Sequence, residues 1–85
     1  MILDTKEASC IIQILVLLNK KKNKYNQMFK TTKVSHTTLQ NSLKELINKK
    51  FIKKHDIGHM KVDYEITEKG KKLLEILLNL QEILR

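Results

Sequence analysis

The sequence predicts a mainly α-helical domain that carries one small β-hairpin. Three patterns support this prediction: apolar residues at helical spacing near both ends of the chain, a shorter helical stripe in the middle, and an alternating segment before the last helix. The 85 residues suffice for one domain, residues 1–85, with a modest core. The predicted order of elements is helix, short strand, helix, helix, strand, strand, helix.

The first predicted helix runs from about residue 5 to residue 21. Asp4 followed by Glu7 has the spacing of a capping box, which favours a helix start at this point. The apolar residues of this segment cover more than one face of the helix, and they are Ala8, Cys10, Ile11, Ile12, Ile14, Leu15, Val16, Leu17 and Leu18. Because a domain of this size offers little to cover such a helix on all sides, we expect part of it to face a second subunit.

Two shorter helices are predicted in the middle of the chain, joined by a turn at Val34 and Ser35. Tyr25 is predicted in a short strand, and Asn26 is the predicted N-cap of a helix that ends near Thr32. Ser35 is the predicted N-cap of the next helix, residues 36–50, whose apolar stripe is Leu39, Leu43, Leu46 and Ile47. The opposite face of that helix is polar.

A hairpin and a long helix complete the prediction. The strands span residues 51–57 and 60–67, with Gly58 and His59 as the turn between them. Thr67 caps the last helix, and Gly70 near its start permits close packing. Four leucines of this helix have the spacing of a heptad seam, and they are Leu73, Leu77, Leu80 and Leu84. Residues 67–85 are therefore predicted to be a dimerisation helix.

Positive charge is concentrated in one block of the sequence. Between Lys20 and Lys54 there are eleven lysines and a single acid, Glu45. This block alone carries more positive charge than the net +8 of the whole chain. The block contains the two short helices and the start of the hairpin, so these elements are predicted to face a polyanion.

The order of two short helices, a tight turn between them and a two-stranded wing after them is that of a winged helix-turn-helix. The stretch from Asn26 to Ile52 resembles the helix-turn-helix core of winged-helix regulators. A second segment is similar to the wing-exit segment of the MarR, PadR and related archaeal winged-helix families. It is Tyr64-Glu65-Ile66-Thr67-Glu68-Lys69-Gly70 with Leu73 and Leu74. The chain looks most like the small archaeal members that dimerise through their last helix. This resemblance implies a DNA-binding transcriptional regulator.

The polar face of the third predicted helix is the candidate for reading double-stranded DNA, because an α-helix fits the major groove. The predicted DNA-binding residues are Ser35, His36, Thr37, Gln40, Asn41 and Lys44 at this helix, and Lys33, Lys53, Lys54, His59 and Lys61 around it. Related families often carry arginine on this helix, and this chain has none there. Since glutamine and asparagine pair best with adenine, we expect a site rich in A·T pairs.

Both end helices carry more apolar residues than one small domain needs, which favours a two-fold homodimer. The predicted interface residues are Ile11, Ile14, Leu15, Leu18, Leu73, Leu77, Leu80 and Leu84. Such a dimer would place two recognition helices about one DNA turn apart, and it would bind a palindromic site.

Other chemistry has little support in the sequence. Cys10 is the only cysteine and is expected to be a buried apolar residue. His36, His55 and His59 lack the spacing of a zinc site, and neither a metal nor a cofactor is expected. No glycine-rich phosphate loop or nucleophile motif points to an enzyme, and no small-molecule ligand is evident. The longest apolar run is too short to span a membrane, so we expect a cytoplasmic protein.

Two other functions remain open from the sequence alone. Lysine-rich charge without arginine on the polar helix also fits an architectural protein that coats DNA without sequence preference. A winged-helix module that binds protein is the second alternative, and the block of positive charge argues against it.

Overall fold

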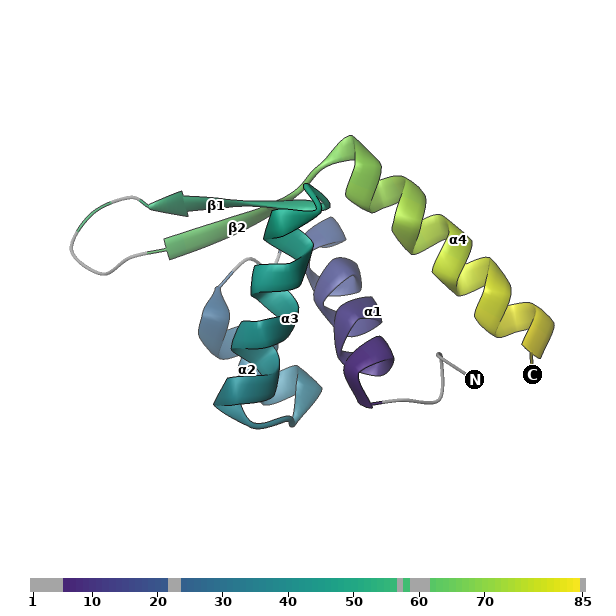
Figure 1. The fold of residues 1–85 in the computed structure, drawn as a ribbon, viewed down its shortest axis with the longest axis horizontal. Coiled ribbons are helices and arrows are strands. Elements are labelled where there is room, and N and C mark those ends of the chain that lie inside the picture. The colour runs from purple at the N-terminus through teal and green to yellow at the C-terminus, as the bar shows by residue number, and fades with distance from the viewer. Residues whose placement is uncertain (1–5, 22–23, 57, 59–61, 85) are drawn as a thin grey trace.

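The computed structural model of the chain describes residues 6–21, 24–56, 58 and 62–84. Its elements are α1 (Lys6–Asn19), α2 (Tyr25–Thr32), α3 (His36–Asn48), β1 (Ile52–Asp56), β2 (Val62–Ile66) and α4 (Glu68–Leu84). The three shorter helices gather on one side of the hairpin, and α4 leads away from it (Figure 1). This mainly helical arrangement with one antiparallel hairpin confirms the predicted fold class. The predicted capping residue Asp4 lies outside the described residues.

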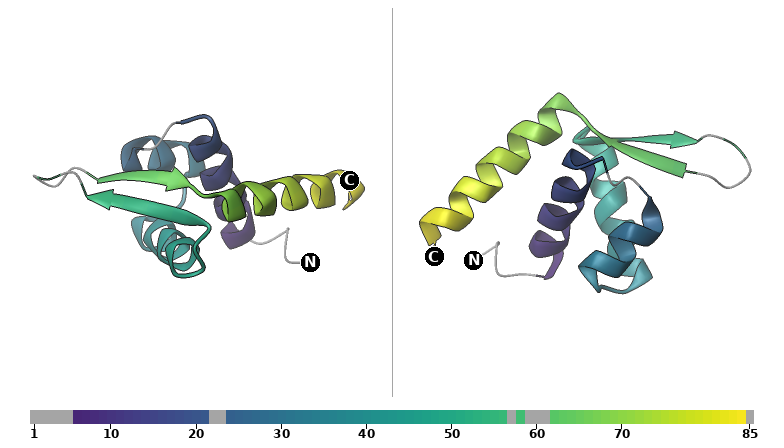
Figure 2. Two further views of the ribbon diagram at one scale, coloured as in Figure 1. Left: turned by 90° about the horizontal axis from the view of Figure 1, so that it is seen from above. Right: turned by 180° about the vertical axis from the view of Figure 1, so that it is seen from behind.

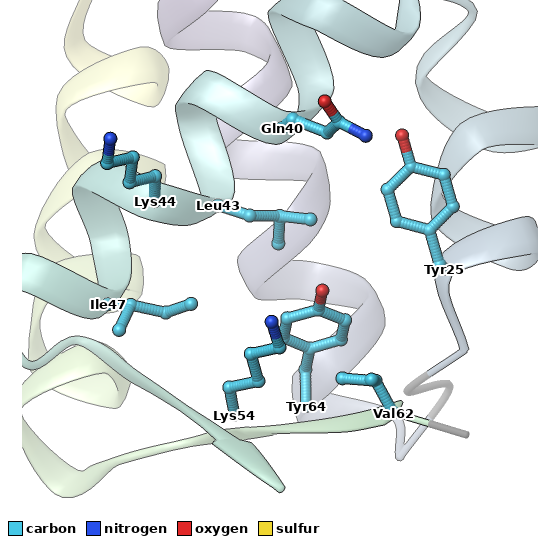
Figure 3. A pocket seen from close by; sticks show the side chains of 8 residues that line it. All are labelled: Tyr25, Gln40, Leu43, Lys44, Ile47, Lys54, Val62 and Tyr64. Atoms are coloured by element: carbon cyan, nitrogen blue, oxygen red, sulfur yellow. The ribbon is translucent and has the colours of Figure 1, made fainter. Parts of the chain in front are cut away.

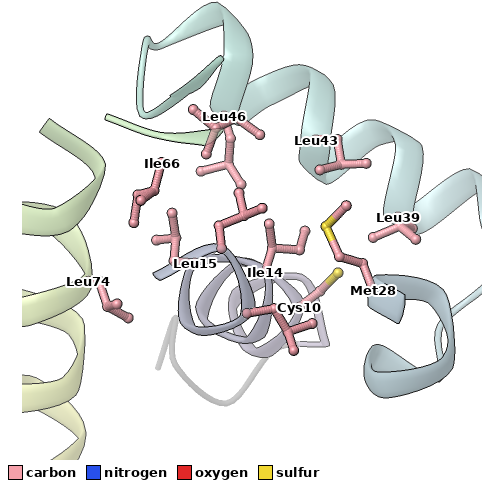
Figure 4. Close-up of a cluster of buried hydrophobic side chains, with 12 residues drawn as sticks. Cys10, Ile14, Leu15, Met28, Leu39, Leu43, Leu46, Ile66 and Leu74 are labelled. Carbon is pink, nitrogen blue, oxygen red and sulfur yellow. The ribbon is translucent and has the colours of Figure 1, made fainter. Parts of the chain in front are cut away.

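Helix α1 lies at the centre of the fold. It contacts α2, α3, α4 and β2, and Figure 4 shows leucines of α3 and Leu74 of α4 converging on it. The expectation that part of α1 faces a second subunit is therefore wrong for its inner side, which elements of the same chain already cover, whereas Ile11 is half-buried. Ile14, Leu15 and Leu18 are at most 4% exposed, so they retain no surface for a partner.

The turn between α2 and α3 is built by backbone geometry and capping. Lys33 has a left-handed backbone with φ 55°, and its N–H donates to the Phe29 carbonyl, which ends α2. Ser35 caps α3 as predicted, because its hydroxyl oxygen accepts a hydrogen bond from the Thr38 backbone N–H at 3.1 Å. Helix α3 buries its leucine stripe against α1, and this packing turns its polar face outward.

The start of α2 differs from the sequence prediction in two details. Tyr25 belongs to α2 rather than to a strand, and the extended contact is a single bridge between Lys24 and Asp63. Lys24, rather than Asn26, is the N-cap residue, and its backbone N–H donates to the Gln27 side-chain oxygen at 3.4 Å. The side chains of Lys24 and Asp63 also form an ion pair. These contacts join the beginning of α2 to the hairpin.

The hairpin presents two different faces. β1 and β2 pair antiparallel, with Ile52 opposite Ile66 and Lys54 opposite Tyr64. Because side chains alternate across a strand, the buried Ile52 and Ile66 anchor the same face that carries Lys54 and Tyr64 farther out. Lys53 lies on the opposite face of the hairpin.

Thr67 and Gly70 fix the point where α4 leaves the hairpin. The Thr67 hydroxyl accepts the Gly70 N–H at 3.0 Å, as predicted for the cap, and donates to the Lys50 carbonyl at 2.8 Å. A β-carbon at Gly70 would lie 2.1 Å from the carbonyl oxygen of Phe51. No residue with a side chain fits at this position unless the backbone moves, which confirms the predicted close packing.

Replacing Gly70 by alanine is therefore expected to destabilise the domain. Alanine favours a helix by about 1 kcal/mol over glycine, but overpacking against backbone costs about 3 kcal/mol, so the free energy of unfolding should fall by about 2 kcal/mol. Urea denaturation followed by circular dichroism measures this change. Lys72→Ala, at an exposed position of the same helix, is the control and should shift the value by no more than about 0.5 kcal/mol. A Gly70→Ala variant as stable as the wild type would contradict the close approach.

Helix α4 keeps an uncovered apolar side. Leu74 is buried, and Leu73 and Leu77 pack half-buried against the core, whereas Ile76 and Ile83 are 61% and 77% exposed. Figure 2 shows the C-terminal turns of α4 reaching away from the hairpin. Among the described residues, no helix is both long enough and apolar enough to cross a bilayer.

Candidate nucleic-acid interface

The outer side of α3 is a row of exposed polar side chains. This row, which we call the α3 ridge, consists of His36, Thr37, Gln40, Asn41 and Lys44. The residues between them hold the ridge outward, because Leu39 and Leu43 are 0% and 3% exposed on the inner side of the helix. The ridge is thus a rigid polar surface, fixed by the packing of α3 on α1.

A groove of about 700 Å³ lies between α3 and the hairpin. Figure 3 shows the side chains that line it, which are Tyr25, Gln40, Leu43, Lys44, Ile47, Lys54, Val62 and Tyr64. Three of these residues are aliphatic, and the polar groups are two ammonium groups, two phenols and one amide. No carboxylate is among the lining residues, so the charge of the groove is positive.

Lys44 and Lys54 bring this positive charge from two different elements, α3 and β1. Neither forms a salt bridge with any carboxylate that the structure describes, whereas Lys49 is paired with Glu45 at 2.8 Å. Lys24 is likewise paired with Asp63. Since Lys44 and Lys54 are not neutralised by a neighbour in the described part of the chain, both are available to an anionic partner.

The two tyrosines of the groove are absent from the sequence-predicted site. Burial raises the pKa of Tyr64 above the ordinary value of 10.0, and the neighbouring Tyr25 adds to this effect. The Tyr64 phenol therefore stays protonated at neutral pH and can donate a hydrogen bond. The alternation of its strand predicts Tyr64 as an inward-facing residue, and the sequence gives no sign that its face continues into a groove beside α3.

Three aromatic rings connect α2 to the start of α3. The rings of Phe29 and His36 stack with centroids 3.8 Å apart and planes within 6° of parallel. The ring of Tyr25 lies 5.8 Å from that of His36, and the Tyr25 hydroxyl lies 2.9 Å from His36 Nδ1. His36, predicted as a DNA contact, therefore also takes part in the packing of the helix-turn-helix.

The remaining predicted DNA-binding residues are placed differently from one another. The Ser35 hydroxyl is engaged with Thr38 in the cap of α3, so its observed role is structural. Lys33 is exposed at the turn between α2 and α3. Lys53 is exposed on the hairpin face away from the groove. His59 and Lys61 lie outside the described residues.

The hairpin face that carries Lys53 is electrostatically mixed. His55 Nε2 lies 2.9 Å from a carboxylate oxygen of Glu65, and this hydrogen bond holds the pKa of Glu65 below its ordinary value of 4.5. Glu65 is therefore ionised at neutral pH, and Lys53 is among the charges that act on it. The two lysines of β1 thus face different surroundings, since only Lys54 lies in a groove without carboxylates.

The predicted dimer residues on α4 are all at or near the surface. Leu73, Leu77 and Leu80 are half-buried, as is Ile11 of α1, and Leu84 is 43% exposed. Ile76 and Ile83, which the heptad seam leaves out, are more exposed than any of them. Their spacing of seven residues places them in one row beside the leucines, which is the sequence signal that could have found them.

No group of three metal-binding side chains is found within residues 6–21, 24–56, 58 and 62–84. Cys10 is 1% exposed, which confirms its expected burial.

Comparison with known proteins agrees with this architecture. No curated protein matches the chain. The HxlR-like helix-turn-helix family matches residues 8–85, a range that includes the α3 ridge, the hairpin and α4. The relation to the MarR and PadR families stays a prediction. The chain therefore belongs to the HxlR-like helix-turn-helix family, and this membership indicates a DNA-binding transcriptional regulator.

Proposed function

We propose that the chain is a homodimeric regulator that places α3 in the major groove of double-stranded DNA and its hairpin beside the adjacent backbone. The observation that carries this proposal is the exposed α3 ridge next to a groove with two lysines that no carboxylate of the described residues neutralises. A helix that is held rigidly by its inner leucines and is polar on its outer side has the form that major-groove reading requires.

The groove suits a sugar–phosphate strand. Ammonium groups on its two sides, from Lys44 and Lys54, can bind phosphates, and the phenol of Tyr64 can donate a hydrogen bond to another oxygen. The aliphatic side chains between them can contact deoxyribose. The groove therefore gives the DNA backbone a path between α3 and the hairpin, while the α3 ridge faces the bases.

Sequence reading is assigned to Gln40 and Asn41. The amide of each residue can donate one hydrogen bond to an adenine and accept another from the same adenine. Each such amide–adenine pair contributes about 1–3 kcal/mol of discrimination between bases. The double variant Gln40→Ala with Asn41→Ala is expected to lose preference for its best site by at least about 30-fold, because two such pairs together contribute about 2 kcal/mol or more, and to keep its affinity for random DNA. Fluorescence anisotropy with matched and mutated duplexes measures both values. Unchanged sequence preference would assign base reading to other residues.

The homodimer is supported by the uncovered side of α4. Ile76 and Ile83 expose 61% and 77% of their surface, and Leu80 lies between them on the same side of the helix. A second copy can cover this side through a two-fold axis, which adds buried apolar area to a small domain. Two copies would carry two α3 ridges and so match a palindromic site.

An architectural DNA-binding protein is the second candidate function. It is favoured by one feature, the absence of arginine from α3, whose only lysine is Lys44. Binding through lysines and phosphates alone would show little preference among sequences.

One experiment separates these functions. The protein is titrated against a duplex selected from a random library and against random duplexes of the same length, at two salt concentrations. A preference of ~10³ or more supports the sequence-specific regulator. Equal affinities with a steep salt dependence would replace it by the architectural protein. No binding at physiological salt would leave a protein-binding module.

A further inference from the structure

We propose that Tyr25 is a positioning residue that holds His36 in one tautomer, so that the Nε2–H of His36 is presented to DNA as a hydrogen-bond donor. The contact with DNA rests on the function proposed above. The effect of Tyr25 on His36 rests only on the geometry at the junction of α2 and α3.

The hydrogen bond between the two side chains has a preferred direction. The Tyr25 hydroxyl lies 2.9 Å from His36 Nδ1. A phenol is a good donor, and the unprotonated nitrogen of a neutral imidazole is a good acceptor. The Tyr25 O–H therefore donates to Nδ1, which must then be the nitrogen without a proton. The ring proton of neutral His36 consequently lies on Nε2.

The orientation of the imidazole ring is fixed as well. It stacks on Phe29 with planes within 6° of parallel, while Tyr25 holds its Nδ1 edge. His36 is nevertheless exposed, and no side chain or carbonyl in the described ranges forms a hydrogen bond with Nε2. His36 is the first residue of α3, and Gln40 follows four residues later on the same side of the helix. The free Nε2–H thus belongs to the α3 ridge.

Because the exposed edge of the His36 ring only donates, its partner on DNA must be a hydrogen-bond acceptor. In the major groove the acceptors are the N7 of a purine, the O6 of guanine and the O4 of thymine, and on the backbone the acceptor is a phosphate oxygen. The amino groups of adenine and cytosine and the methyl group of thymine offer no acceptor. A base contact would make the effect of His36 depend on sequence at one position, whereas a phosphate contact would affect all sequences alike.

The tautomer is tested without DNA by NMR of ¹⁵N-labelled imidazole at about pH 8, where histidine is ordinarily neutral. His36→Gln identifies the His36 signals. We expect the wild type to show the Nε2–H form and Tyr25→Phe, which keeps the aromatic ring, to show a mixture of tautomers. Tyr64→Phe removes the other phenol of the groove and should leave the His36 signals unchanged. An Nδ1–H form in the wild type, or no change in Tyr25→Phe, would overturn the proposal.

Binding to the selected duplex tests the consequence for DNA. Tyr25→Phe should weaken binding by roughly 2- to 4-fold, because an even mixture of tautomers halves the competent form of His36 in each subunit of a dimer. In a His36→Gln background the same change should have no further effect. An equal loss in both backgrounds would show that Tyr25 acts without His36 and would sink the inference. A wild type that binds no DNA would overturn the function proposed above, while the NMR result still decides the role of Tyr25.

Discussion

Replacing Lys44 and Lys54 together by alanine is expected to lower affinity for DNA of any sequence by about 100- to 1,000-fold at low salt, because a dimer without these lysines leaves about four phosphates without their cationic partners. Both lysines line the groove and neither is paired with a described carboxylate. The slope of log affinity against log salt should also fall by about 0.9 for each phosphate that is no longer neutralised. Fluorescence anisotropy at several salt concentrations measures both quantities.

Lys53→Ala is the matched control for this experiment. It removes an identical charge from the residue that precedes Lys54 in the same strand, but from the hairpin face that also carries Glu65. Although the charge pattern of the sequence also predicts Lys53 as a DNA contact, its placement leads us to expect a loss of no more than about threefold. If Lys53→Ala weakened binding as much as Lys54→Ala, the groove would not be the path of the backbone.

The double variant Ile76→Glu with Ile83→Glu is expected to be monomeric. Two charges on the exposed side of α4 cannot be buried against a second copy without a large desolvation cost. The monomer should bind a palindromic site at least about 100-fold more weakly than the dimer, because the two half-sites are no longer bound by one molecule. Affinity for an isolated half-site should stay the same. Analytical ultracentrifugation and anisotropy measure assembly and binding.

Leu78→Glu serves as the control for the dimer. Leu78 is also exposed on α4, at 44%, but it lies about 200° around the helix from Ile76. It should remain dimeric and bind the palindrome as the wild type does. A wild type that sediments as a monomer at micromolar concentration, or an unchanged dimer in the double isoleucine variant, would refute the assignment of this side of α4.

The elements of this fold could be predicted where the local sequence carries the physical cause. Ser35 ahead of a leucine stripe specifies both the start of α3 and its inner face. Thr67 and Gly70 likewise specify the cap of α4 and its close contact with the chain at Phe51. In each case the capping groups lie within a few residues of one another, so the local sequence is enough to predict where the helix begins.

The partners of these elements could not be predicted in the same way. The apolar pattern of α1 shows that several faces are buried, but it does not say that four elements of the same chain bury them. For this reason Ile14 and Leu15 were expected at a dimer interface and are found in the core. Tyr25 is predicted in a short strand, whereas it lies in α2 and the extended contact among the described residues is limited to the bridge at Lys24.

The candidate site was predictable in outline only. The polar face of α3 follows from helical spacing, but the groove needs the hairpin to lie beside α3 with a particular face toward it. The register that pairs Lys54 with Tyr64 separates Lys54 from Lys53, which are chemically identical in the sequence. The stack of Phe29 and His36 depends on the left-handed turn at Lys33, and no local pattern predicts that geometry.

Binding of DNA by the α3 ridge and the groove beside it is measured by titrating ¹⁵N-labelled protein with the selected duplex and following the backbone amide signals. We predict that the largest shifts occur at residues 36–44 and at Lys54 and Tyr64, and that the signals of the C-terminal half of α4 change little. Shifts confined to α4, or to the hairpin face of Lys53, with residues 36–44 unaffected, would contradict the account.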